Sequence, residues 1–516
     1  MTAISLHFEL PENLTVTKFL KKLSKKLNFE IATQQHTSKT FYDTFDWRLY
    51  NAGLLCERNQ SKSTSHISLI NRITGECLAQ EELAETPRFS GQYPGGQLKT
   101  HLTPLIEMRA LLPLSQLPQQ VYRLNVLNKD QKTILRIKLD EYESLTNHIS
   151  LQPLKGYEKA AEKVSTLLQK SLALKTATPD SVLNNAVKQQ GRKASDYSSK
   201  LNIKLEPGMQ ADKASKIIYQ QLLRAIQINE SNTQADIDTE FLHDFRVAIR
   251  RTRAGLSQIK NTLPLSIVTE YVDFFAWLGQ ITGATRDLDV YLLSYKQYQA
   301  ALPTSLQQDL SPLYAFLKHK QVIAQKELAA QLSNSQYRKQ LAAWEQFLKE
   351  PLAKKNAESN AKLTIKELAD QRTWKVYKRV LKEGSAISET SPAEALHDLR
   401  KTCKKLRYLM EFFQSLYPAK EFKAVLKALK GFQSVLGDFQ DYEIQEVNLK
   451  QFSKEMMAKG VASNTFLAMG VLVQHLDSMR CAARDDFAEQ FDLFKQAKNQ
   501  QTFKSLFAHQ GRGKTQ

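Results

Sequence analysis

The spacing of apolar residues changes near residue 200 of this 516-residue chain. Before that point, short runs such as HISLINRI (66–73) and QKTILRIKLDEY (131–142) are separated by turn-rich stretches such as SGQYPGGQ (90–97). Such runs predict β-strands. After it, apolar residues recur every three or four positions, which predicts amphipathic helices. The clearest examples are ADKASKIIYQQLLRAIQINE (211–230), SPLYAFLKHKQVIAQKELAAQL (311–332), SQYRKQLAAWEQFL (335–348) and AVLKALKGFQSVLG (424–437).

A segment rich in turn-forming residues separates the two patterns. It contains TATPD, QQGRKASDYSSK and LEPG, and it predicts a linker over residues 176–208. We therefore expect a first domain over 1–175 and a helical domain over 209–510. A chain of this length can bury a core in each of two or more domains.

The helical part contains an internal duplication. HDFRVAIRRTRAGL, beginning at His243, returns as HDLRKTCKKLRYLM at His397, an offset of 397 − 243 = 154. The same offset relates Pro264 to Pro418, Gly283 to Gly437 and Asp287 to Asp441. A register kept without gaps predicts two copies of one helical unit, over about 209–350 and 360–510.

Each copy carries a stripe of cations on one side of a helix. At 100° per residue, His243, Arg246, Arg250 and Arg253 fall within an arc of roughly 80°, and apolar residues occupy the adjoining arc. His397, Arg400, Lys404 and Arg407 repeat the arrangement. Cations spaced by four residues repel one another by a few tenths of a kcal/mol per pair, and no carboxylate interrupts either stripe. An external anion would relieve that repulsion. Asp244 and Asp398 lie off the stripes, where an ion pair or a helix N-terminal role is expected.

These paired ladders, with the G-x-x-x-D elements that follow them, resemble the CHAD domain, the conserved histidine alpha-helical domain. The resemblance covers roughly residue 205 to the C-terminal region. It implies an all-α domain of two pseudo-symmetric helical bundles whose basic groove binds inorganic polyphosphate. The residues that match the motif, or lie beside it, and that we expect to contact polyphosphate are His243, Arg246, Arg250, Arg251, Arg253, His397, Arg400, Lys401, Lys404, Lys405, Arg407 and Tyr408.

The N-terminal part has a weaker resemblance to a second family. FYDTFDWRLYNAGLLCER (41–58) is similar to the signature of the CYTH, or triphosphate tunnel metalloenzyme, family, which implies an α+β β-barrel or tunnel. That family begins with an E-x-E-x-K strand that holds a divalent metal, whereas this chain has ISLHFELP with only Glu9. We therefore predict a degenerate CYTH-like domain. Residues that could still line a tunnel are Arg58, Arg109, Arg123, Arg136, Lys138, Asp140 and Glu141.

Composition agrees with an anionic partner. The formal net charge is +19 and the sequence pI is about 9.5. The chain has no apolar run of membrane-spanning length and its N-terminus does not resemble a signal peptide, so we expect a soluble cytoplasmic protein with no membrane partner, and association with polyphosphate granules is compatible with this. The scattered cysteines Cys56, Cys77, Cys403 and Cys481 predict reduced thiols rather than a disulfide framework or a zinc site.

Two other functions stay open beside polyphosphate binding. An inorganic triphosphatase acting through the N-terminal tunnel is disfavoured by the missing E-x-E-x-K strand, so we expect no catalytic residue, metal or cofactor. Nucleic-acid binding needs aromatic rings that stack on bases. Tyr408 is the only aromatic residue predicted beside the exposed side of either stripe, which makes nucleic acid the weaker partner.

Overall fold

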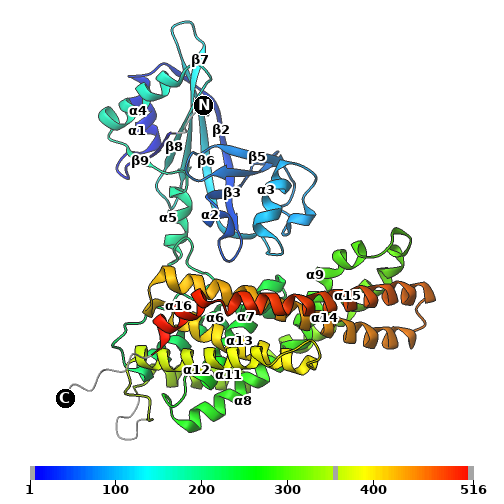
Figure 1. The fold of residues 1–516 in the computed structure, drawn as a ribbon. Coiled ribbons are helices and arrows are strands. Elements are labelled where there is room, and N and C mark those ends of the chain that lie inside the picture. Colours follow the sequence, from blue (N-terminus) through cyan, green and yellow to red (C-terminus); the bar gives the residue numbers. More distant parts are fainter. Residues whose placement is uncertain (1–5, 352–357, 509–516) are drawn as a thin grey trace, which may run out of the picture. The chain divides into compact units, whose positions relative to one another are not determined.

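The computed structural model describes residues 6–351 and 358–508, so residues 1–5, 352–357 and 509–510 of the predicted domains lie outside the described part. The chain divides into two compact units, Met1–Ser199 and Lys200–Gln516. The first is built on a sheet and the second is helical (Figure 1). The predicted order of an α+β part followed by an all-α part is confirmed.

The first unit contains one nine-stranded antiparallel sheet among its described residues, in the order β5-β4-β3-β2-β6-β7-β8-β1-β9. The strands are β1 (Leu6–Glu9), β2 (Phe29–Asp43), β3 (Leu54–Gln60), β4 (Ser65–Asn71), β5 (Cys77–Glu82), β6 (Leu112–Leu127), β7 (Thr133–Tyr142), β8 (His148–Pro153) and β9 (Lys175–Ala177). The helices are α1 (Val16–Ser24), α2 (Arg48–Asn51), α3 (Gln97–Ile106), α4 (Glu158–Leu172) and α5 (Ser181–Gln189). The runs 66–73 and 131–142 are strands β4 and β7, as predicted.

Side-chain alternation along these strands separates a core face from a charged face. Leu135, Ile137 and Leu139 of β7 are buried in one apolar cluster with side chains of α1 and α4. Residues at the intervening positions, including Lys138 and Asp140, must point to the opposite face of the sheet. Charged side chains of this unit therefore lie on the face of the sheet opposite this apolar cluster.

The segment predicted as a linker is structured. Its first residues form β9, which pairs with β1, and α5 follows. Val182, Leu183, Ala186 and Val187 of α5 are buried together with Trp47. On the other side of the division, Ile203 and Leu205 belong to the core of the helical unit. The linker prediction for 176–208 is therefore wrong. Polar turn residues outnumber the apolar ones in this segment, so its composition did not reveal that the apolar side chains are buried, and the two units meet at a boundary near residue 199.

The second unit is entirely helical in its described residues. Its helices are α6 (Ala211–Gln234), α7 (Thr239–Gln258), α8 (Leu265–Ile281), α9 (Gly283–Ala300), α10 (Ser311–Ser333), α11 (Ser335–Lys349), α12 (Ile365–Ser385), α13 (Ala393–Phe413), α14 (Ala419–Met457), α15 (Ser463–Phe494) and α16 (Ala497–Phe507). Short 3-10 turns occupy Ser90–Gln92 in the first unit and Thr304–Leu306, Gln308–Leu310 and Gln414–Leu416 in the second. The predicted helices 211–230, 311–332, 335–348 and 424–437 are confirmed as α6, α10, α11 and part of α14.

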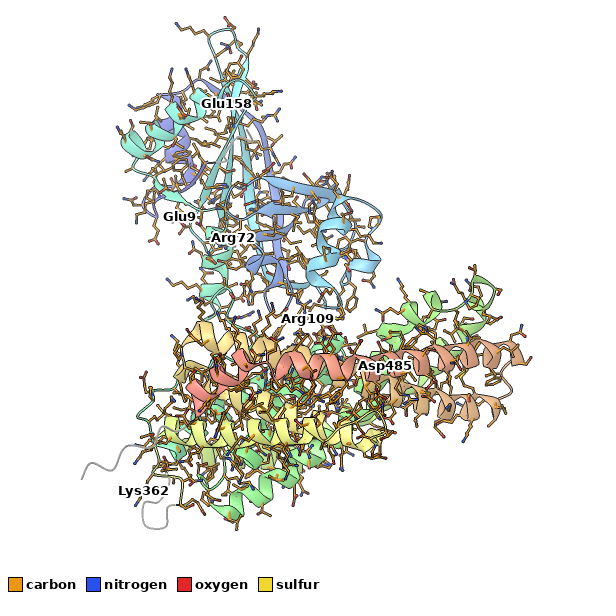
Figure 2. The ribbon with its side chains drawn as sticks, in the orientation of Figure 1. Glu9, Arg72, Arg109, Glu158, Lys362 and Asp485 are labelled. Atoms are coloured by element: carbon orange, nitrogen blue, oxygen red, sulfur yellow. The ribbon has the colours of Figure 1, made fainter. Side chains whose placement is uncertain are left out.

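Two apolar clusters hold the helical unit together. The larger one includes side chains from α6, α7, α8, α12, α13 and the first half of α14. The smaller one joins α9 and α10 to the second half of α14 and the first half of α15. Helices α14 and α15 run side by side, and Asp485 marks α15 (Figures 1 and 2). Within the described residues, none of the helices combines the length and the apolarity needed to cross a bilayer.

Candidate anion-binding site

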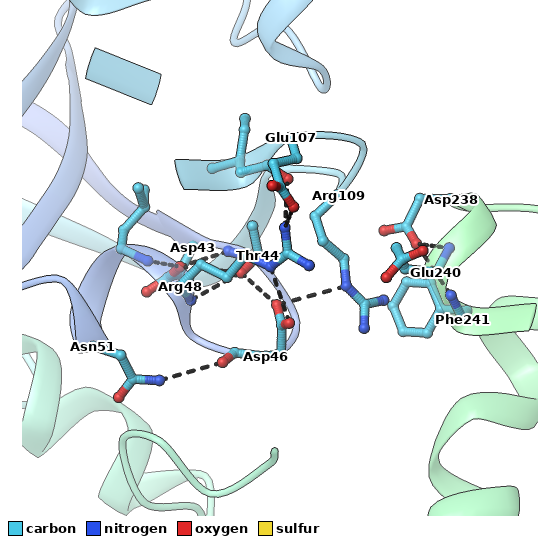
Figure 3. Close-up of polar contacts among 12 residues, drawn as sticks. Asp43, Thr44, Asp46, Arg48, Asn51, Glu107, Arg109, Asp238, Glu240 and Phe241 are labelled. Carbon is cyan, nitrogen blue, oxygen red and sulfur yellow. Dashed lines mark hydrogen bonds and ion pairs between the residues drawn. The ribbon is translucent and has the colours of Figure 1, made fainter. Parts of the chain in front are cut away.

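The two basic helices of the duplication pack against each other as α7 and α13. Asp238 caps the first turn of α7, because its carboxylate accepts hydrogen bonds from the backbone N–H groups of Glu240 and Phe241 (Figure 3). Arg251 of α7 donates to Glu411 of α13 at 2.8 Å, and both side chains are largely buried. This ion pair joins the two helices that carry the stripes.

A cavity of about 270 Å³ opens where the two stripes meet. Helices α7, α9, α13 and α14 supply its walls. Its lining residues are His243, Arg246, Arg250, Arg286, Asp287, Val290, Tyr291, Arg400, Asp441, Ile444, Gln445 and Asn448. The cavity therefore joins residues that are up to 205 positions apart in the sequence (448 − 243).

The lining repeats the 154-residue offset of the duplication. Arg246 corresponds to Arg400, Asp287 to Asp441, Val290 to Ile444 and Tyr291 to Gln445, since each pair differs by 154. The two copies thus present equivalent positions to one shared space. The G-x-x-x-D elements noted in the sequence supply both aspartates.

The two equivalent arginines are held differently. Arg246 donates to the carbonyl oxygen of Gly279 at 3.0 Å and to the hydroxyl of Thr282 at 2.7 Å. Burial and the neighbouring Arg250 lower the pKa of Arg246 to about 10, so the guanidinium stays charged at neutral pH.

Arg400 is held by side chains rather than by backbone. It donates to Gln440 at 2.6 Å and to Asp441 at 3.0 Å. Gln440 also contacts Nδ1 of His397, so this histidine is tied to the arginine through one amide. Its equivalent, His243, lines the cavity itself.

Arg250 and Lys404 occupy equivalent positions and share one property. Among the described residues neither side chain makes a hydrogen bond or an ion pair with a carboxylate. Burial lowers the pKa of Lys404 to about 8, and the neighbouring Arg400 and Arg250 act in the same direction. Both cations are therefore stripe members whose charge is available to an outside anion.

Sequence reasoning missed several residues of the cavity. Arg286, Tyr291, Asp287 and Asp441 come from α9 and α14 rather than from the basic helices. Burial raises the pKa of Asp287, and Arg246 and Arg286 oppose that rise. The repeated Asp287 and Asp441 were the available signal, because they keep the offset of the duplication. Asp287 and Asp441 thus reach the stripes from neighbouring helices, and Glu411 of α13 lies 3.7 Å from Arg407 of its own stripe, so the expectation that neither stripe meets a carboxylate on its own helix is wrong for the second copy.

The remaining predicted contacts are not among the lining residues of the cavity. Arg253 is exposed on α7, and Lys401 pairs with Asp398 at 3.1 Å. Lys405 and Arg407 are half-buried on α13, and the Arg407 guanidinium lies 5.3 Å from the ring centre of Tyr408. Tyr408 is only 5% exposed, because it packs into the larger apolar cluster. Its predicted place on the exposed side of the stripe is wrong.

Comparison with known proteins places a family on this part of the chain. Residues 217–450 match the model of the CHAD domain, and this range contains both basic helices and all lining residues of the cavity. The chain therefore carries a CHAD domain. The CHAD domain of the plant Ricinus communis shares 25% identity with this chain, covers 56% of it and 95% of its own length, and superposes with a TM-score of 0.47.

Two further matches extend the comparison. An uncharacterized protein of Mycobacterium tuberculosis is 24% identical over 235 residues, which is 45% of this chain. The match spans only 44% of that relative's own length. A putative adenylyl cyclase of Hippeastrum with a dominant triphosphatase activity aligns with 32% of this chain and 86% of its own, at 12% identity and a TM-score of 0.26.

The charged face of the first unit, outside the CHAD domain, contains a compact ionic cluster. Lys39 of β2 lies 3.0 Å from Asp140 of β7 and 3.6 Å from Glu57 of β3, and Lys138 lies 3.0 Å from Asp140. Burial opposes the charged forms, but Asp140 and Glu57 raise the pKa of Lys39 and the two lysines hold the pKa of Asp140 well below its usual range. We call Lys39, Glu57, Lys138 and Asp140 the sheet cluster.

Two histidines adjoin the sheet cluster. His7 of β1 and His148 of β8 have ring centres 5.1 Å apart. Burial, and then Lys39, lowers the pKa of His7 to about 4, while burial, and then His7, lowers the pKa of His148 to about 3. Both rings are therefore neutral at pH 7. The alternation His7-Phe8-Glu9 in the sequence could have predicted the place of His7, since successive side chains of a strand point to opposite faces and Phe8 points to the core.

Most of the other predicted tunnel residues lie elsewhere. Arg58 alternates with Glu57 along β3 and so points to the other face, where it donates to Ser65 at 2.8 Å. Arg123 and Arg136 are exposed. Glu141 accepts from Tyr122 at 3.0 Å, and Glu9 accepts from Asn185 of α5 at 3.3 Å. Figure 2 labels Glu9 at the end of β1.

Arg109 belongs to a separate group of polar contacts. It is 1% exposed and lies 3.6 Å from Asp46, whose carboxylate also accepts from Thr44 and Arg48 (Figure 3). Of the predicted tunnel residues, only Lys138 and Asp140 meet in the sheet cluster. No group of three or more His, Cys, Asp or Glu side chains is arranged to hold a metal ion in the described ranges. The four cysteines are free thiols, as predicted.

Proposed function

We propose that the CHAD domain of this chain binds inorganic polyphosphate in the cavity between α7, α9, α13 and α14. The observation that carries the proposal is that cations from both copies of the duplication line one cavity. Four arginines and two aspartates give the lining a formal charge of 4 − 2 = +2 with His243 neutral. Lys404 adds to this charge from the equivalent position to Arg250.

The chemistry of the lining suits a linear polyanion. Guanidinium groups bind phosphate oxygens through two parallel N–H donors, and such charge-assisted bonds are about twice as strong as neutral ones. A chain of phosphates can neutralise Arg250, Lys404 and Arg286 together and release its own counterions. Binding should therefore weaken steeply as salt is added.

The same lining argues against single-stranded nucleic acid as the principal ligand. Tyr291 is the aromatic residue among the lining side chains, and it is only 3% exposed. A ring buried to that extent cannot offer a face on which a base could stack. Competition between long-chain polyphosphate and single-stranded RNA for a labelled polyphosphate tests this preference, and equal competition would contradict it.

The double variant Arg250→Ala, Lys404→Ala tests the site directly. Both side chains lack a carboxylate partner, so their removal should leave the helical fold intact, and the circular dichroism spectrum checks this. We expect a loss of affinity of roughly a hundredfold or more, since each hydrogen bond to a charged group contributes about 1.5–3 kcal/mol. Adding Arg246→Ala and Arg400→Ala should extend the loss further.

A matched control removes the same charge from another surface. Lys375→Ala, Lys382→Ala takes two exposed lysines from α12, and titration calorimetry should find its affinity close to that of the wild type. If the Arg250, Lys404 variant is folded and binds polyphosphate as well as this control, the proposed site is wrong.

A further inference from the structure

Helix α14 carries a second row of cations outside the cavity. Lys420, Lys423, Lys427 and Lys430 are spaced by three or four residues and all are exposed. At 100° per residue they lie within an arc of roughly 80°. Across the helix from them, Phe422, Val425, Leu429 and Phe432 are buried in the larger apolar cluster. We call the four lysines the α14 lysine row.

The row lies on the same face of α14 as the cavity wall. Counting on from Lys420 at 100° per residue, Asp441, Gln445 and Asn448 fall within the same arc of roughly 80°. All three line the cavity. The lysine row is therefore the continuation of the cavity wall toward the beginning of the helix, and Lys430 and Asp441 are 11 residues or about 16 Å apart.

The surface between the row and the cavity is open. It is formed by small residues, because Gly431, Ser434 and Gly437 lie on or beside this face. A Cβ atom added at Gly431 or Gly437 would meet no atom within 4 Å. Asp438, which is exposed, is the carboxylate at the edge of this surface. A ligand that leaves the cavity along α14 thus meets no covering side chain at either glycine before it reaches the lysines.

The row has no internal counter-charge. Among the described residues, none of the four lysine side chains makes a hydrogen bond or an ion pair with a carboxylate. Like charges three and four residues apart repel one another on a helix. An exposed row without neutralising partners is a surface on which an added anion lowers the energy of the helix.

Only one copy of the duplication has this row. The offset of 154 relates Lys420, Lys423, Lys427 and Lys430 to Ser266, Thr269, Asp273 and Ala276. The first copy also breaks its helix between α8 and α9 at Thr282, where α14 continues without interruption. Both copies line the cavity, but only the second copy carries a row of lysines beyond it, on α14.

We infer that the α14 lysine row extends the cavity into a track for long linear polyphosphate, so that chain length sets affinity. This inference rests on the proposed function and adds a second binding surface to it. A short chain fills the cavity alone. A long chain enters the cavity and continues over Gly437 and Gly431 to the four lysines.

The test compares two ligands on the full-length protein. The row variant carries Lys420→Ala, Lys423→Ala, Lys427→Ala and Lys430→Ala, and alanine preserves the helix. The control variant removes four exposed lysines from α10, α11 and α12 through Lys326→Ala, Lys339→Ala, Lys375→Ala and Lys382→Ala. Affinities for tripolyphosphate and for long-chain polyphosphate are measured by titration calorimetry at several salt concentrations.

The row variant should bind tripolyphosphate within about twofold of the wild type, because exposed charges more than about 10 Å away are screened. Its affinity for long-chain polyphosphate should fall by roughly tenfold or more. The logarithmic slope of its salt dependence should weaken by about 0.7 for each phosphate that a lysine no longer neutralises. The control variant should keep both affinities. The preference for long chains would then disappear only in the row variant.

Other outcomes separate the two proposals. If the wild type binds neither ligand, the proposed function fails. If it binds both, and the row and control variants match for long chains, the track is overturned while the cavity stands. If the row variant instead loses binding to anionic phospholipid vesicles and keeps its affinity for long-chain polyphosphate, the row is a membrane-binding surface and the inference is also overturned.

Discussion

The sheet cluster of the first unit and the cavity of the CHAD domain both combine cations with carboxylates, but they balance these charges differently. The sheet cluster pairs Lys39 and Lys138 with Glu57 and Asp140, a balance of 2 − 2 = 0, and Lys39 and Asp140 are 5% and 2% exposed. The cavity sets four arginines against two aspartates and leaves Arg250 exposed.

The difference follows from the cost of removing charge from water. Buried ions lose several kcal/mol of hydration each, so they persist only as neutralised groups with good geometry. A partly open surface can keep an excess of one sign, because water and salt screen it until an anion binds. A buried cluster whose charges sum to zero therefore indicates a structural role. A partly open cavity with excess positive charge indicates a binding role.

The largest expected effect on stability comes from a substitution that disrupts the sheet cluster. Lys39→Met leaves Asp140 and Glu57 buried with only Lys138 to compensate them, so the first unit should lose about 3–5 kcal/mol of stability. Hydrogen exchange of peptides from residues 1–199 measures the loss. Arg123→Met removes an exposed cation from the same sheet and should change little. Polyphosphate affinity should not respond to either change, and a large loss of binding in Lys39→Met would contradict the structural role.

Acid should destabilise the first unit in a window set by its histidines. Folding lowers the pKa of His7 to about 4 and of His148 to about 3, from an ordinary value of 6.5. As pH falls from 6.5 toward 4, these two histidines therefore become protonated in the unfolded chain but stay neutral in the folded unit. Stability should drop by roughly 1.4 kcal/mol per pH unit for each histidine.

Thermal unfolding or hydrogen exchange as a function of pH checks this window. Replacing His7 by Gln should flatten the slope, whereas His36→Gln at an exposed position should leave it unchanged. A slope that appears only below pH 4 would assign the acid sensitivity to carboxylates such as Asp140 instead of the histidines.

A smaller effect sharpens the picture of the cavity. With the pKa of Lys404 lowered to about 8, part of its charge is lost as pH rises through 8, and a bound phosphate would restore that proton. Polyphosphate affinity should therefore decrease by up to about tenfold per pH unit above 8. The variant Lys404→Arg keeps its charge and should lose this dependence in the same titration. A slope that persists in the arginine variant would point to another group.

The smallest expected effect concerns the carboxylate that pairs with Arg400. Asp441 competes with an incoming phosphate for this guanidinium, and the pair is partly exposed. Asp441→Asn keeps the shape and removes the charge, so affinity should rise by up to about fivefold, because a weak exposed ion pair contributes roughly 1 kcal/mol at most. Asp287→Asn makes the equivalent change in the first copy. A loss of affinity in Asp441→Asn would mean that the aspartate positions Arg400 for binding.

Local patterns predicted the elements better than the boundaries. The apolar periods of 211–230 and 311–332 predicted the starts of α6 and α10, but α6 ends four residues later than predicted and α10 ends one residue later. Helical amphipathicity is a property of neighbouring positions, so it identifies a helix more surely than its end. Helix α5 was missed, since its buried side chains are few and lie among turn residues. Tyr408 was misplaced because helical angle alone cannot tell which side of a helix a neighbour will cover.

By itself, the sequence determined the duplication, the two cationic stripes and the change from strands to helices, since each depends on spacing along the chain. Only the tertiary structure decided that Asp287, Asp441, Arg286 and Tyr291 share a cavity with those stripes, and that Lys39, Glu57, Lys138 and Asp140 neutralise one another. Charge acts through space and through the surrounding dielectric. Its partners can therefore be identified only when the chain has been folded onto itself.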